Sequence, residues 1–96
     1  MGAGMKHKGM PDAEVSAALA LRALEWLLRD DGRRERFMAM TGCGPEDLRA
    51  AAEAPWLLVA VLDYLLGDES LLLAFCADCD IAPDMPRLAH LRLTRS

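Results

Sequence analysis

The sequence predicts an all-α protein, a compact bundle of five to six short helices that cross one another. Leu and Ala supply much of the 53% hydrophobic residues; both favour helices, whereas sheets favour β-branched and aromatic residues. Residues that begin or end helices recur at short intervals, so the segments are too short for a long up-and-down four-helix bundle.

The first helix is predicted over residues 12–29, with Asp12 as its N-cap. One apolar side follows helical spacing and is expected to face the core. A second apolar side, nearly opposite, carries Val15, Leu19 and Trp26. A helix that is apolar over more than half of its circumference is either central to its bundle or contacts another chain. We therefore select Val15, Leu19 and Trp26 as a candidate interaction surface.

The other helices are predicted from turn residues. Asp30-Asp31-Gly32 ends the first helix, and Gly42 suits the left-handed position that ends the second. Pro45 and Pro55 each suit a first helical position. The expected helices cover about residues 33–41, 45–52 and 55–66, a fifth capped by Asp68 and closed by 81–83, and a last one over 87–93. The nearly all-apolar stretch 56–66 is expected to be the buried central element.

We expect residues 1–11 to form a flexible N-terminal tail and residues 12–96 to form one helical domain. The start of the chain lacks the apolar core of a secretory signal. The longest apolar run, 56–66, is far shorter than the roughly 20 residues of a membrane span. A net charge of −4 opposes general binding to nucleic acid. These observations predict a cytoplasmic protein with neither membrane nor nucleic acid as a partner.

The charged residues are unevenly distributed. Between Asp63 and Asp84 there are six acids and no Lys or Arg, and the following residues carry Arg87, Arg92 and Arg95 without an acid. The second helix begins with Arg33, Arg34 and Arg36, which oppose the helix dipole. We interpret both groups as solvated surface, with an anion or acidic-partner site as the alternative for the arginines. Asp63, on an apolar helix, is expected on an exposed strip or beside an arginine.

Several short segments, in this order and spacing, resemble a group of small bacterial proteins classed as domain of unknown function family 3572. They are residues 20–27, 36–42, 45–49, 55–57, 61–66, 68–69 and 72–75, within a span of about 17–79. The resemblance implies a small helical domain and supplies no catalytic residue to carry over. The three cysteines are not part of the family pattern, which argues against a thiol-based function for the family.

Cys76 and Cys79 form a Cys-x-x-Cys pair near the end of the fifth helix. Together with Cys43 and His90 they would complete a tetrahedral metal set, and alone they could be redox-active. However, the end of a helix disfavours thiolate, and neither histidine stands at ligand spacing from a cysteine. Free cysteines commonly pack as small apolar residues, so core packing is the favoured interpretation.

The segment from Phe37 to Ala52 has the outline of a helix-turn-helix. Its second helix opens with Glu46 and Asp47, which would repel phosphates, and offers only Arg49. A corner of the bundle is the favoured interpretation.

We find no nucleophile–base pair, carboxylate dyad or phosphate-binding loop, so the sequence predicts no enzyme activity and no cofactor. The leading hypothesis is a non-enzymatic helical interaction module that binds a protein partner or forms a homodimer. The alternatives are a thiol or metal sensor using Cys43, Cys76 and Cys79, and a degenerate helix-turn-helix DNA binder.

Overall fold

A computed structural model describes residues 11–50 and 54–95, and every regular element in this part is a helix. The predicted all-α fold of short, crossed helices is therefore confirmed. The predicted tail lies almost wholly in residues 1–10, outside the described residues. The helices are α1 (Ala13–Arg29), α2 (Asp31–Thr41), α3 (Pro45–Arg49), α4 (Pro55–Leu66), α5 (Glu69–Cys79) and α6 (Met85–Arg95).

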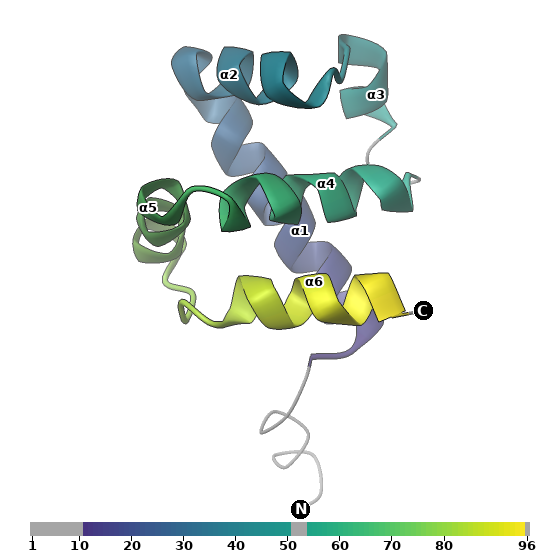
Figure 1. Cartoon of the computed structure of the whole chain (residues 1–96), viewed down its shortest axis with the longest axis vertical. Helices are drawn as coiled ribbons and strands as arrows, with labels where there is room; N and C mark the ends of the chain where they lie inside the picture. The colour runs from purple at the N-terminus through teal and green to yellow at the C-terminus, as the bar shows by residue number, and fades with distance from the viewer. Residues whose placement is uncertain (1–10, 51–53, 96) are drawn as a thin grey trace, which may run out of the picture.

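Helix α1 is the central helix of the domain, because α2, α4 and α6 all pack against it. Figure 1 shows α4 and α6 crossing in front of α1, with α2 and α3 beyond one side of α4 and α5 joining the ends of α4 and α6. α4 and α6 also pack on each other. None of the described helices is long and apolar enough to cross a membrane.

Acidic N-caps begin three of the helices. The carboxylates of Asp12, Asp30 and Asp68 accept hydrogen bonds from backbone amides of the first turns of α1, α2 and α5 at 2.8, 2.9 and 3.1 Å. Such caps satisfy amides that have no partner within the helix. Because Asp30 caps it, α2 begins at Asp31, two residues earlier than the sequence predicted. Gly42 ends α2 in the predicted left-handed conformation, with φ 77°.

Two of the arginines that open α2 lie at the end of α1. Arg33 donates to the carbonyl oxygen of Trp26 at 3.2 Å, and Arg34 donates to that of Leu28 at 3.4 Å. The last carbonyls of a helix lack partners within it, and the helix dipole favours a cation there. The arginines that oppose the dipole of α2 therefore complement that of α1.

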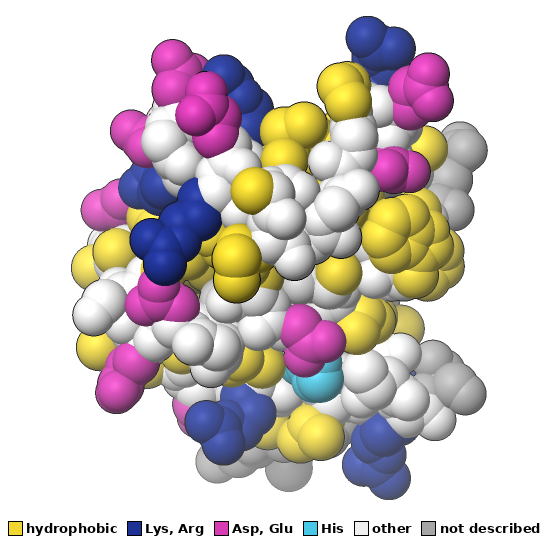
Figure 2. All heavy atoms as spheres, turned by 45° about the horizontal axis from the view of Figure 1, so that its top comes forward, with side chains coloured by type: hydrophobic (Ala, Val, Ile, Leu, Met, Phe, Trp, Pro, Cys, Tyr) yellow, Lys and Arg dark blue, Asp and Glu magenta, His cyan; other side chains and the backbone are white. Residues whose placement is uncertain are grey.

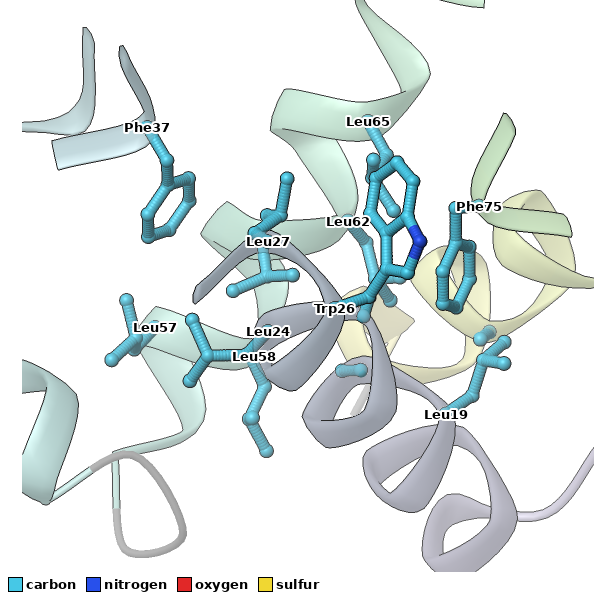
Figure 3. Packing of buried hydrophobic residues seen from close by; sticks show 14 of the residues in the cluster. Leu19, Leu24, Trp26, Leu27, Phe37, Leu57, Leu58, Leu62, Leu65 and Phe75 are labelled. Carbon is cyan, nitrogen blue, oxygen red and sulfur yellow. The ribbon is translucent and has the colours of Figure 1, made fainter. Parts of the chain in front are cut away.

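The core is formed mainly by α1 and α4, with contributions from the other helices. Its largest side chains are Leu19, Leu24, Trp26, Leu27, Phe37, Leu57, Leu58, Leu62, Leu65 and Phe75 (Figure 3). α4 is central as predicted, but Trp56 is not buried: it is 55% exposed. Trp56 follows Pro55 in the first turn of α4, and the buried face of this helix begins at Leu57.

A row of small residues is buried on one face of α1. Ser16, Ala20 and Ala23 are completely buried and share one face of α1, and Pro86 and Ala89 are the buried residues of α6. Side chains three or four residues apart lie on one helix face. Small buried side chains let two helices approach closely, and α1 and α6 form the most extensive pairing between two described helices.

Enlarging this row should destabilise the domain. We expect Ala20→Leu to lower the free energy of unfolding by about 1–3 kcal/mol, since a close-packed core has no room for a larger side chain at this completely buried position. Ala39→Leu, the same change at an exposed position of α2, should alter it by at most about 0.5 kcal/mol. Urea denaturation of both variants measures the difference. Equal stability of the two variants would show that the core around Ala20 is loosely packed.

Candidate functional site

Trp26, predicted to lie on a contact surface, is instead buried and joins three helices. Its ring meets Phe75 of α5 edge-on, with centroids 5.6 Å apart, and its Nε1–H donates to Asp78 Oδ2 at 2.8 Å. The guanidinium carbon of Arg33, on α2, lies 3.8 Å from the centroid of the indole ring. Figure 3 shows the Trp26 and Phe75 rings side by side. A large aromatic side chain that is buried and contacted by other helices in this way stabilises the fold.

The predicted surface of Val15, Leu19 and Trp26 is therefore corrected. Leu19 and Trp26 are 7% and 2% exposed, whereas Val15 is 46% exposed. The reason is long-range: the C-terminal half of α5 covers this side of α1, through Phe75 and Asp78. Only the N-terminal part of the predicted surface remains open to solvent.

Val15 and Leu19 line a hollow of about 340 Å³ at the surface. Its other wall is the connection between α5 and α6 with the start of α6. The apolar lining consists of Val15, Ala18, Leu19, Ile81, Ala82 and Met85. The volume is at the lower end of the range for ligand sites, and such sites are usually apolar with a few polar groups. We call this feature the α1 hollow.

Arg22 and Asp80 are the two charged residues that line the α1 hollow. Arg22 donates to the carbonyl oxygen of Cys79 at 3.2 Å, so its cation lies at the C-terminal end of α5. Asp80 ends α5 with φ 57° and ψ 53°, the left-handed conformation, and it is the one described non-glycine residue with positive φ. This conformation costs most side chains roughly 1–2 kcal/mol, although Asp and Asn adopt it more readily than others.

A second hollow, of about 270 Å³, lies between α2 and α4 and is more polar. Asp63 and Asp68 contribute acids to it and Arg36 contributes a cation. Asp68 is occupied as the N-cap of α5, and Asp63 Oδ1 lies 2.7 Å from Nε2 of His90 on α6. Figure 2 shows this histidine against an acidic side chain. Asp63 lies on an exposed strip as predicted, with a 64% exposed side chain, but its partner is a histidine and no arginine.

The three cysteines are free thiols that do not form one site. Cys43 and Cys76 are buried and Cys79 is half-buried, as core packing predicts. Burial raises the pKa of the Cys76 thiol, and the neighbouring Cys79 raises it further. A raised pKa keeps the thiol protonated, and metal binding and nucleophilic attack both need thiolate. Within residues 11–50 and 54–95 no three metal-binding side chains lie together, so Cys43 and His90 do not complete a set with the Cys-x-x-Cys pair.

The α2–α3 corner lacks the form of a DNA-reading element. α3 has only five residues, Pro45–Arg49, and residues 51–53 lie outside the described part of the chain. The carboxylate of Asp47 accepts a hydrogen bond from the Gly44 amide at 2.9 Å, which fixes the start of α3. A recognition helix must be long enough to lie in the major groove. These features support the interpretation of this segment as a corner of the bundle.

The described residues thus define a class, a small domain of six crossed helices with a mainly apolar hollow beside α1. It belongs to the family described as "Protein of unknown function (DUF3572)", whose profile matches residues 13–95. The match extends the resemblance found in the sequence over residues 17–79 to nearly the whole chain. No curated protein and no solved structure matches the chain.

Sequence reasoning did not identify one wall of the α1 hollow. The pattern indicated that 81–83 closes α5, but it predicted no binding role for Asp80, Ile81, Ala82 or Met85. The available signal was weak and local: α5 ends without a glycine, and Asp is one of the residue types that can take the left-handed position in its place. No local pattern indicates that this position faces Val15, which lies at the other end of the sequence.

The two tryptophans provide a direct check of this arrangement, since the chain has only these two. In Trp56→Phe the remaining Trp26 should emit at short wavelength and resist quenching by acrylamide, because it is buried. In Trp26→Phe the remaining Trp56 should emit at long wavelength and be quenched readily. Trp26→Phe should also lower the free energy of unfolding by about 1–3 kcal/mol, and Trp56→Phe by at most about 0.5 kcal/mol. Strong quenching of Trp26 in the folded protein would contradict its central role.

The cysteines should differ in their rates of alkylation. At neutral pH we expect iodoacetamide to modify Cys79 first and Cys76 much more slowly. The raised pKa of Cys76 lowers the fraction of this thiol present as thiolate, and burial limits the access of the reagent. Mass spectrometry of peptides at successive times measures each rate. In urea the two rates should become similar. A Cys76 that reacts as fast as Cys79 in the folded protein would revive a thiol-based function.

Proposed function

We propose that this chain is a non-enzymatic helical module that binds another protein through the α1 hollow. One observation carries the proposal: half-exposed Val15 stands at the rim of a hollow whose lining is mostly apolar. Apolar surface that remains open beside a packed core gains free energy when a partner covers it. The hollow has room for a large apolar side chain or two from the partner.

The charged groups at the α1 hollow favour binding over catalysis. Of the residues that line it, only Arg22 and Asp80 are charged, and Arg22 is already bound to a backbone carbonyl. General acid–base or nucleophilic catalysis needs a reactive group held beside a second group that activates it. The lining of the α1 hollow contains no such pair.

The secondary structure favours a partner helix as the bound element. One common mode for an extended peptide is to join the edge of a sheet, and residues 11–50 and 54–95 contain no strand; another is a groove lined by aromatic rings, and none lines the α1 hollow. A helix instead inserts apolar side chains, spaced three or four residues apart, into a groove between helices. The α1 hollow, with α1 on one side and the start of α6 on the other, supports this mode.

Photo-crosslinking in cells of the source organism tests the proposal. p-Benzoylphenylalanine at Val15 should give a crosslink to one distinct polypeptide, because this position rims the hollow. The same residue at Leu73 of α5 is a matched control, since Val15 and Leu73 are both 46% exposed. Crosslinking from Met85, on the opposite wall, should give the same polypeptide.

The outcome for the proposed function depends on which polypeptide is crosslinked from each position. One polypeptide recovered from positions 15 and 85 and missing from position 73 supports the proposed function. No crosslink from positions 15 and 85 beyond that from position 73 contradicts it. A crosslink only to a second copy of this chain would make the module a homodimer and overturn the proposed partner.

A further inference from the structure

The acids between Asp63 and Asp84 differ in whether the fold uses them. Asp63 pairs with His90, Asp68 caps α5, and Asp78 accepts the indole N–H of Trp26. Asp80, like Glu69 and Asp84, makes no side-chain hydrogen bond or ion pair within the described part of the chain. It is exposed and lines the α1 hollow. The fold therefore leaves one carboxylate at the rim of this hollow without a partner.

The other charge at the rim does not neutralise Asp80 through a direct contact. The guanidinium of Arg22 donates to the Cys79 carbonyl, and the structure shows no ion pair between Arg22 and Asp80. The partial negative charge at the carboxyl end of α5 is complemented by Arg22 on the Cys79 carbonyl, so this cation already has a partner there. A cation brought to Asp80 by a partner would therefore meet an unpaired carboxylate, with the Arg22 guanidinium held on the neighbouring Cys79 carbonyl.

The residue type at position 80 is also not the one that stability favours. Asp80 ends α5 in the left-handed conformation, where Gly has the least strain. Replacing Gly by Asp at such a position brings a carboxylate at the cost of strain. Here that carboxylate has no structural contact, so its position at the α1 hollow suggests a role in binding.

We infer that the partner segment is an amphipathic helix that carries a Lys or Arg about one turn from its apolar anchor. The inference rests on the proposed function and specifies the chemistry of the partner. The apolar side chain enters the α1 hollow against Val15 and Ile81, and the cation pairs with Asp80 at the rim. Residues three or four apart on a helix share a face, so one helix presents both groups together. The charge pair selects the orientation of the helix and its partner more than it adds affinity.

Two synthetic helical peptides test this inference on the full chain. They share the same leucine anchors and differ only in having Lys or Glu one turn from each anchor. Binding is followed by NMR through the methyl groups of Val15, Leu19 and Ile81, which report the hollow directly. At low salt the Lys peptide should shift these methyls and bind about three- to fivefold more tightly than the Glu peptide, as expected for an exposed ion pair.

Matched variants separate Asp80 from the overall charge of the protein. Asp80→Asn should remove most of the preference for Lys, and Asn also tolerates the left-handed conformation, so the variant should fold. Glu69→Gln makes the same change of charge at an exposed acid in the first turn of α5. It should change either affinity less than twofold. Thermal unfolding of both variants verifies that the domain is intact.

The outcomes distinguish the inference from the function on which it rests. Loss of the Lys preference in Asp80→Asn alone supports the inference. Binding at the same methyls with no Lys preference, or with equal effects of Asp80→Asn and Glu69→Gln, overturns the inference and leaves the proposed function standing. If neither peptide shifts these methyls, the proposed function itself loses support. Shifts that depend only on protein concentration would assign the hollow to a second copy and overturn the inference.

Discussion

The arrangement of this domain depends on the burial of one indole ring. Burying Trp26 costs less free energy when its N–H has an acceptor, and Asp78 of α5 supplies one at 2.8 Å. This bond and the edge-on contact with Phe75 fix the C-terminal half of α5 against α1. Arg33 closes the remaining face of the ring and ties the start of α2 to the end of α1. Three helices thus take their relative positions from contacts with one side chain.

The α1 hollow is a consequence of that contact. Because Asp78 is held by Trp26, α5 ends beside α1, and Arg22 reaches the Cys79 carbonyl. The chain then turns through Asp80 and runs past the N-terminal half of α1 as residues 81–85 before α6 packs on the small residues of α1. A turn packed beside a helix buries less of the helix surface than a second packed helix would. Val15, on the α1 side of the hollow, therefore remains half-exposed.

The sequence predicted the helices well because their ends are determined locally. A carboxylate that accepts an amide three residues ahead, or a glycine at a left-handed position, acts within one turn of chain. The same local patterns show which residues share a face but do not show which faces become covered. Trp26 was therefore placed on the surface and Trp56 in the core, whereas the structure has them the other way round. The contact that decides the position of Trp26 joins residues 52 positions apart.

The candidate site was predictable only on its α1 wall, and the charges explain why the other wall was missed. Several charged residues in this small domain serve helix ends: Asp12, Asp30 and Asp68 cap helices, and Arg33 and Arg34 donate to the last carbonyls of α1. A sequence shows all of these as equivalent surface charges, so one without such a role does not stand out. Only the folded chain distinguishes a carboxylate that the fold uses, such as Asp78, from one two residues later that it leaves open beside an apolar hollow. Because the fold does not need that second carboxylate, its effect on binding can be measured separately from stability.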